Sequence, residues 1–191
     1  MEKRIIFERT AMERINKIIK HRLFREYIEK IRIHEQDRIF CKHDTIHFLD
    51  VCRLAEIDWL NYCMLQMKSN SSVQGGLVIT ESTLQQINRE LLYAAGLLHD
   101  IGRWQEYETG VRHEISSAEL APGILKECGF LQEEIEKIVY AIINHRNSDV
   151  KEQISLAGFL YRADKKSRPC YFCGAEKECD WSATKKNLEL K

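Results

Sequence analysis

An apolar run that ends in two adjacent ionisable residues constrains this chain more than any other feature of its sequence. In 93-YAAGLLHDIGRW-104, mostly apolar residues lead up to Leu98 as in a buried helix, and His99 and Asp100 follow at once. A carboxylate is tolerated in a protein interior only when it is paired or bound to a cation, because its burial alone costs several kcal/mol. The fold must therefore supply partners for this pair. Gly102 is expected to end the helix through a left-handed turn.

Helical spacing of apolar residues predicts an all-α fold. Two prolines and nine glycines are few for 191 residues, and no run of alternating strand residues with turn signals appears. Ser82 and Gln85 resemble a capping box, which predicts that a helix starts there and runs to His99. The expected helices lie within 1–35 (one or two), 44–67, 82–99, 131–145 and 149–163.

Two further segments interrupt this pattern. The stretch 69-SNSSVQGGLVIT-80 is polar and contains glycine, which predicts a loop. Ser116 and Glu119 resemble a second capping box, so a helix is expected to start near Ser116. Pro122-Gly123 lies inside the same apolar pattern and predicts either a kink or a restart of that helix.

The length suits one domain with a small appendage. We expect a helical domain over residues 1–168, with its core at about 40–168 and N-terminal helices in 1–35. From Lys165 onward the helical pattern breaks, and the following segment is rich in cysteine. Residues 169–191 are therefore expected to form an irregular, cysteine-rich tail packed on the helical domain.

The charge balance argues against some classes of partner. The chain has 29 basic and 29 acidic residues, whereas proteins that coat nucleic-acid polymers or membrane surfaces carry a basic excess. Its apolar stretches are too short to span a bilayer, and the N-terminal residues lack the unbroken apolar segment of a secretory signal. We therefore expect a cytoplasmic protein whose seven cysteines are reduced.

Several ionisable residues continue apolar stripes toward the interior. His47, His99, His145 and Asp164 each share a helix face with apolar residues four and seven positions away, and His113 precedes an expected helix start. One inward histidine is more often a hydrogen-bonded core residue than a ligand. Several inward imidazoles with two carboxylates are best explained by a divalent cation, which satisfies both kinds of group together.

The order His47, His99-Asp100, Asp164 resembles the HD-domain superfamily of metal-dependent phosphohydrolases. The local contexts 47-HFLDVCRLA-55, 97-LLHDIGR-103 and 160-LYRAD-164 resemble the family's ligand segments, and the likeness spans about residues 40–168. The resemblance implies an all-α, phosphodiesterase-like helical bundle. It also implies a first metal ion bound by His47, His99, Asp100 and Asp164.

Some members of this superfamily insert two more histidines between the His-Asp pair and the last aspartate, and His113 and His145 occupy that interval here. The resemblance then implies two ions bridged by Asp100. This alternative is favoured over a single ion with His113 and His145 as phosphate or outer contacts. The expected metals are Fe, Mn, Co or Zn. The segment after Asp100 lacks the Gly-Tyr-Pro motif of cyclic dinucleotide phosphodiesterases, so such a substrate is not expected.

The expected function is metal-dependent hydrolysis of a phosphoester or phosphoanhydride of a nucleotide or another small phosphorylated molecule. Asp100 would hold the metal, and Arg103 and Arg146, beside proposed ligands, would hold phosphate charge, with Lys165 and Arg168 as further candidates. Two alternatives remain open. One is an HD-fold di-iron oxygenase, and the other is a non-catalytic sensor that binds a metal and a nucleotide.

The tail contains a second group of possible metal ligands. Cys170, Cys173 and Cys179 are spaced closely enough for a structural Zn²⁺ or an iron–sulfur cluster, with Cys41 or His43 as the fourth ligand. The alternative is a set of reduced, partly buried thiols beside aromatic residues. The spacing does not match a standard zinc knuckle and leaves both interpretations open.

Overall fold

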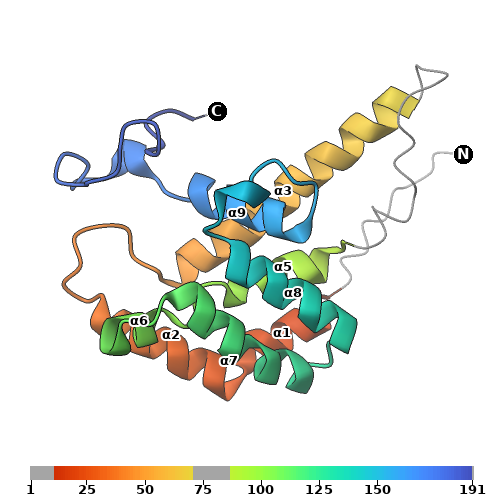
Figure 1. The fold of residues 1–191 in the computed structure, drawn as a ribbon, viewed down its shortest axis with the longest axis horizontal. Helices are drawn as coiled ribbons and strands as arrows, with labels where there is room; N and C mark the ends of the chain where they lie inside the picture. Colours follow the sequence, from red (N-terminus) through yellow and green to blue (C-terminus); the bar gives the residue numbers. More distant parts are fainter. Residues whose placement is uncertain (1–10, 71–86, 191) are drawn as a thin grey trace, which may run out of the picture.

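The computed structural model describes residues 11–70 and 87–190, which form helices, turns and irregular segments without a strand (Figure 1). The all-α prediction is confirmed. No helix in these ranges has the length and apolarity needed to cross a membrane. The α-helices are α1 (Glu13–Lys20), α2 (Arg22–His34), α3 (Thr45–Asn70), α5 (Arg89–Leu98), α6 (Arg103–Thr109), α7 (His113–Glu127), α8 (Gln132–Asn144) and α9 (Leu156–Lys166). Short 3₁₀ turns cover Ser148–Val150 and Cys170–Phe172.

Helix α5 is the buried centre of the bundle. Every residue from Leu91 to Leu98 is buried, because α5 packs against α1, α3, α8 and α9. Gly96 allows the close approach of α3, since a Cβ at this position would lie 2.6 Å from the sulfur of Cys52. This contact sets the distance between the helices that carry His47 and His99, and so it positions the functional site.

The turn after α5 differs in detail from the prediction. Gly102 does not adopt a left-handed conformation, because its φ is −86°. A glycine is needed there for another reason: a Cβ would lie 2.4 Å from the backbone nitrogen of Ser117 in α7. The Gly102 amide also donates to the Ser117 hydroxyl at 2.9 Å. The turn that carries Asp100 is thereby fixed against α7.

Helix α7 begins earlier than predicted. Its first residue is His113, and Ser116 is a buried residue inside the helix, so the predicted capping box at Ser116 and Glu119 is wrong. Pro122 neither stops nor restarts the helix, which continues to Glu127. Buried residues on either side, including Ile124, keep both halves packed in the core, and this packing outweighs the lost backbone hydrogen bond.

The other predicted boundaries fit unevenly. Helices α1, α2, α3 and α8 match their expected ranges closely. The helix expected over 149–163 begins only at Leu156, where the Ser155 hydroxyl accepts a hydrogen bond from the Gly158 amide. Ser82, Gln85 and residues 71–80 of the expected loop lie outside the described residues. Within the described residues, helix α5 begins at Arg89, and the side chain of the preceding Asn88 caps its first turn.

Candidate metal centre

Residues from five helices and one loop meet in a single buried cluster. His47 lies in the first turn of α3, His99 and Asp100 follow α5, His113 opens α7, His145 follows α8 and Asp164 lies in α9. His43 joins them from the segment before α3. Each of these seven side chains is at most 8% exposed. The helix ends converge here because α5 is buried among α3, α8 and α9.

The two carboxylate oxygens of Asp100 face two different sets of imidazoles. Oδ2 faces the Nε2 atoms of His43, His47 and His99 at 3.6, 3.8 and 3.4 Å. Oδ1 faces the Nε2 atoms of His113 and His145 at 3.1 and 3.5 Å. Asp100 therefore stands between the two halves of the cluster.

Asp164 completes the first half. Its Oδ1 lies 3.7 Å from His47 Nε2 and 3.9 Å from His99 Nε2. Three groups have all their ligand atoms within 4.8 Å of one another, a spacing at which one ion can contact all members of a group. They are His47, His99 and Asp164; Asp100, His113 and His145; and His43, His47 and Asp100.

The outer nitrogen of each imidazole has a partner that fixes the ring. The Nδ1 atoms of His99 and His145 donate to backbone carbonyls at 2.8 and 2.6 Å. The Nδ1 atom of His43 donates to the carboxylate of Glu35 at 2.5 Å, and the Nδ1 atom of His113 lies 2.6 Å from both the Glu106 carboxylate and Arg103 Nη1. With the proton on Nδ1, the lone pair of Nε2 points into the cluster, as in metal-binding histidines.

The Nδ1 atom of His47 also has a partner that fixes its ring, in this case the hydroxyl of Ser167. Ser167 Oγ donates its proton to the backbone carbonyl of Asp164 at 2.7 Å, so it accepts at 3.2 Å from His47 Nδ1. The Nε2 atoms of His43, His47 and His99 have no hydrogen-bond partner within the described part of the chain. Buried polar atoms of this kind are costly when unpaired, and a metal ion would satisfy all three. The donor set therefore fits a divalent cation.

The protonation states also suit metal binding. Burial lowers the pKa of His99 to about 3 and that of His43 to about 4, and it lowers the pKa of His113. Burial alone would raise the pKa of Asp100, but the surrounding histidines hold it well below its usual range. Neutral imidazoles and an ionised carboxylate are the forms that bind a cation.

Two neighbouring basic side chains keep the Asp164 carboxylate ionised. Burial opposes its charge, but Lys165 and Arg168 lower the pKa of Asp164 strongly. Lys165 Nζ lies 2.6 Å from Oδ2, and Arg168 Nη2 lies 3.2 Å from Oδ1. Lys165 and Arg168, which the sequence analysis gave as further candidates for phosphate binding, therefore also orient the Asp164 carboxylate.

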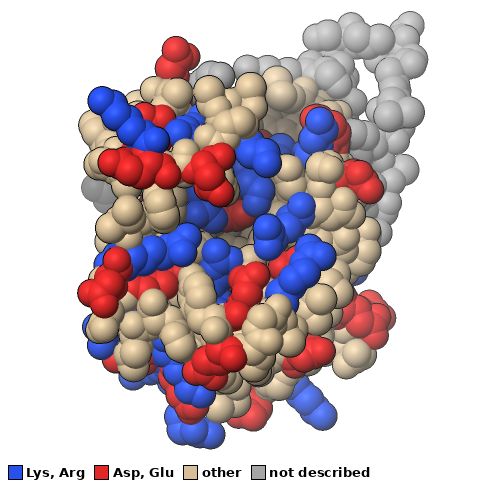
Figure 2. All heavy atoms as spheres, turned by 60° about the vertical axis from the view of Figure 1, so that its left-hand side comes forward, with Lys and Arg blue, Asp and Glu red and all other residues tan. Residues whose placement is uncertain are grey.

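A cavity of about 370 Å³ leads from this cluster to the surface. Figure 2 shows Lys and Arg side chains gathered around a hollow in this face of the molecule. The cations that line the cavity are Arg38, Arg103, Arg146, Lys165 and Arg168. All four basic residues expected near the phosphate are therefore at the cavity, and Arg38 is an additional one that the sequence analysis missed.

His43 and its partner Glu35 were also missed as part of the main site. Glu35 is 2% exposed and accepts from the His43 backbone nitrogen and ring and from the Tyr107 hydroxyl at 2.6, 2.5 and 2.5 Å. Burial opposes the charge of Glu35, but the bonds from His43 and Tyr107 lower its pKa to about 2. The i, i+4 spacing of His43 and His47 was the available signal, whereas no pattern marks Glu35.

The predicted cysteine site is not assembled in the described residues. Cys41, Cys170 and Cys179 line the cavity, but no group of three closely spaced ligand atoms in residues 11–66 and 87–190 includes a cysteine. The alternative in which His43 supplies the fourth ligand is wrong, because Glu35 and Asp100 hold its ring in the histidine cluster. Binding of Zn²⁺ or an iron–sulfur cluster by Cys41 and the tail cysteines remains a prediction.

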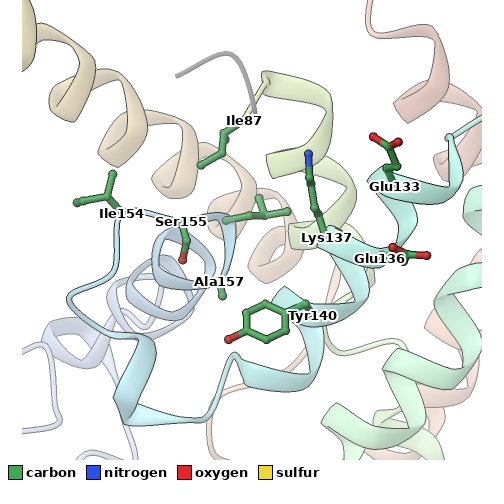
Figure 3. A pocket seen from close by; sticks show the side chains of 9 residues that line it. Ile87, Glu133, Glu136, Lys137, Tyr140, Ile154, Ser155 and Ala157 are labelled. Atoms are coloured by element: carbon green, nitrogen blue, oxygen red, sulfur yellow. The ribbon is translucent and has the colours of Figure 1, made fainter. Parts of the chain in front are cut away.

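The larger cavity does not mark the functional site. A space of about 490 Å³ lies between α8, the start of α9 and Ile87 (Figure 3). Its charged lining consists of Glu133, Glu136 and Lys137, and none of the predicted site residues contributes to it. The chemistry of the donors, rather than cavity size, identifies the site.

Comparison with known proteins places this site in a family context. The HD domain family matches residues 63–168, a range that includes His99, Asp100, His113, His145 and Asp164 and begins after His47. A protein from Clostridium beijerinckii (strain ATCC 51743 / NCIMB 8052), described as an uncharacterized protein, is 37% identical over 179 residues. That alignment covers 94% of this chain and 99% of the relative. No solved structure matches the chain.

Proposed function

The chain belongs to the HD domain family, and from this premise we propose that it is a metal-dependent phosphohydrolase acting on a small phosphorylated molecule. One observation carries the proposal. The two carboxylate oxygens of Asp100 face two different sets of imidazoles, and Asp100 lines a cavity together with five basic side chains. The imidazoles and carboxylates suit a divalent transition metal, and the cations suit phosphate oxygens.

The residues divide between two proposed ions. His47, His99, Asp164 and Oδ2 of Asp100 would hold the first, and His43 lies close enough to Oδ2 to join them. Oδ1 of Asp100, His113 and His145 would hold the second. These donors favour Fe, Mn, Co or Zn over Mg or Ca, which prefer all-oxygen sites.

Bound divalent ions supply an activated water near neutral pH and neutralise charge on phosphoryl oxygens. The chain itself contributes binding and orientation. The Arg103 guanidinium is fixed by Glu106 Oε2 at 3.3 Å and lies 2.6 Å from the His113 ring, so its charge stands next to the proposed second ion. Arg146, which is half-exposed, lies 3.7 Å from the buried Glu114 carboxylate and lines the same cavity.

The proposal is tested by metal content and phosphate release. Purified protein should contain one or two transition-metal ions per chain. It should also hydrolyse at least one member of a panel of phosphomonoesters, nucleotides and dinucleotides supplied with Mn²⁺, Fe²⁺ or Co²⁺, with the products separated by chromatography. Asp100→Ala should lose both properties, while Asp50→Ala, on the exposed side of α3, should keep them. An Asp100→Ala protein that binds metal and hydrolyses the substrate like the unaltered protein would refute the proposal.

Two other functions use the same donors. A di-iron oxygenase would consume oxygen in the presence of reduced iron without releasing phosphate, and a sensor would bind a nucleotide without turnover. The five cations around the cavity favour the phosphohydrolase over the oxygenase, because phosphate groups need cationic partners and oxygen does not. Turnover of the bound nucleotide separates the phosphohydrolase from the sensor.

A further inference from the structure

The C-terminal tail forms one wall of the cavity above the metal centre. Cys170, Cys179, Asp180 and Trp181 line the same cavity as Asp100. In Figure 1 the tail lies beyond the end of α9, on the same side as the segment between α2 and α3. That segment contributes Arg38, Phe40 and Cys41 to the facing wall. Two segments outside the helices therefore enclose the entrance to the site.

The tail is fastened to the helical body by specific polar contacts. The Asn187 side-chain amide donates to the carbonyls of Lys165 and Arg168 at 2.8 and 2.9 Å, and so it ties the tail to the last turn of α9 and to the segment that follows this helix. Lys186 Nζ binds the backbone carbonyl and the carboxylate of Glu176 at 2.7 and 2.8 Å. These contacts close the tail into a loop that holds Trp181 at the cavity.

The charges of the cavity indicate a ligand with several negative charges. Five cations line it, together with the carboxylates Asp100, Glu106, Asp164 and Asp180. A single divalent ion would neutralise Asp100 and Asp164, and a second would add further positive charge. Among the carboxylates of the lining, the five cations would then face only Glu106 and Asp180, and Glu114 outside the lining offsets part of the charge of Arg146. A phosphodiester with one negative charge would leave this excess largely unbalanced, whereas a di- or triphosphate would balance it.

The same cavity presents flat apolar surfaces. Phe40, Tyr107 and Trp181 line it beside the cations. The Trp181 ring is partly buried, and the Arg168 guanidinium lies 5.2 Å from its centre, which orients the indole at the wall. Aromatic side chains next to cations suit a ligand that combines a flat ring with phosphate groups. The volume of about 370 Å³ is near the lower end of the range for ligand cavities, so it suits one nucleotide unit better than two.

We infer that the tail is the recognition wall of this site and that the cavity binds a nucleoside di- or triphosphate, with the base against Trp181 and the phosphates among the arginines. This inference rests on the proposed function for the chemistry, but its binding step can be measured separately. Trp181 is a specificity residue here, since it contacts the base and not the reacting phosphate.

The test measures binding by titration calorimetry in the presence of Mn²⁺. The probes are a non-hydrolysable analogue of adenosine triphosphate and inorganic tripolyphosphate, which has the phosphates but no ring. Trp181→Ala should weaken binding of the analogue about tenfold, the usual effect of losing one base–aromatic stack, and leave tripolyphosphate within about twofold. Trp181→Phe should retain most of the affinity, which excludes collapse of the tail as the cause.

Phe172→Ala is the matched control. Phe172 is also an aromatic residue of the tail, but it is 87% exposed and does not line this cavity. Its replacement should change neither affinity. The inference is overturned if the unaltered protein does not bind the analogue. It is also overturned if it binds the analogue no better than tripolyphosphate, or if Trp181→Ala weakens both probes equally.

The two proposals fail in distinguishable ways. Phosphate release from a simple monoester with no effect of Trp181→Ala on either probe would retain the phosphohydrolase and refute the recognition wall. Selective loss of analogue binding in Trp181→Ala without hydrolysis of any substrate would support the wall and refute the phosphohydrolase.

Discussion

Replacing Glu35 by glutamine should weaken metal binding although Glu35 itself does not face the metal centre. The carboxylate accepts the Nδ1 proton of His43 at 2.5 Å and so directs the Nε2 lone pair toward Asp100. A glutamine amide can instead donate to Nδ1, which moves the ring proton to Nε2. The lone pair that faces Asp100 is then lost.

The expected size of the effect of Glu35→Gln follows from the hydrogen-bond partners that Glu35 has. Losing the outer partner of a metal-binding histidine typically lowers metal affinity about 10- to 100-fold, or about 1.4–2.7 kcal/mol. Glu35 also accepts from Tyr107 and from the His43 backbone, so the mismatched amide should lower the stability of the metal-free protein as well. A cost of about 1–3 kcal/mol corresponds to a fall in Tm of roughly 2–12 °C for a chain of this length.

The assay is a Mn²⁺ titration of metal-free protein by calorimetry, with Tm measured in parallel. Glu29→Gln is the matched control, because Glu29 lies on α2, which Glu35 caps, is exposed and pairs only with nearby Arg32 among the described residues. Glu29→Gln should bind Mn²⁺ like the unaltered protein. If a folded Glu35→Gln protein also does so, His43 is not a ligand and the reasoning from its ring orientation is wrong.

Three further changes test other parts of the structure. His145→Ala should reduce bound metal from two ions per chain to one, measured by elemental analysis, and an unchanged ratio would refute a separate second site. Because burial lowers the pKa of His43 and His99 to about 4 and 3, the unfolded chain takes up more protons below pH 6.5. The free energy of unfolding of metal-free protein, from urea titrations, should therefore fall from pH 7 to pH 5 by at most about 2 kcal/mol for each histidine, and a flat profile would contradict their burial as neutral groups. Gly96→Ala should destabilise the protein by about 1–3 kcal/mol, because its Cβ would lie 2.6 Å from a buried sulfur of α3. Gly123→Ala, where nothing lies within 4 Å, should be neutral or stabilising in the same urea titration, and equal effects of the two changes would refute the close contact.

The sequence by itself determined the helical class and most of the buried candidate ligands. Helical spacing is a local property, so it predicted α3 and α8 within a few residues. It also showed that His47, His99 and Asp164 continue apolar stripes, which is why the structure buries them. The start of α7 was misplaced because a capping pattern also occurs inside that helix, where tertiary packing decides whether it is used. The predicted start of α9 falls in the 3₁₀ turn Ser148–Val150, and the helix begins only after the Ser155 cap.

Only the tertiary structure decided which polar groups share the site. Periodicity assigns a side chain to a face but gives no distance between faces, so the sequence could not show that the oxygens of Asp100 point to different histidines. Glu35 and Trp181 carry no pattern of their own, because their roles arise from contacts with segments far along the chain or from a shared cavity. His43 was one of two candidates for the fourth ligand of the cysteines because of its place in the sequence, whereas the fold turns its ring toward Asp100 and the buried carboxylate of Glu35 holds it there.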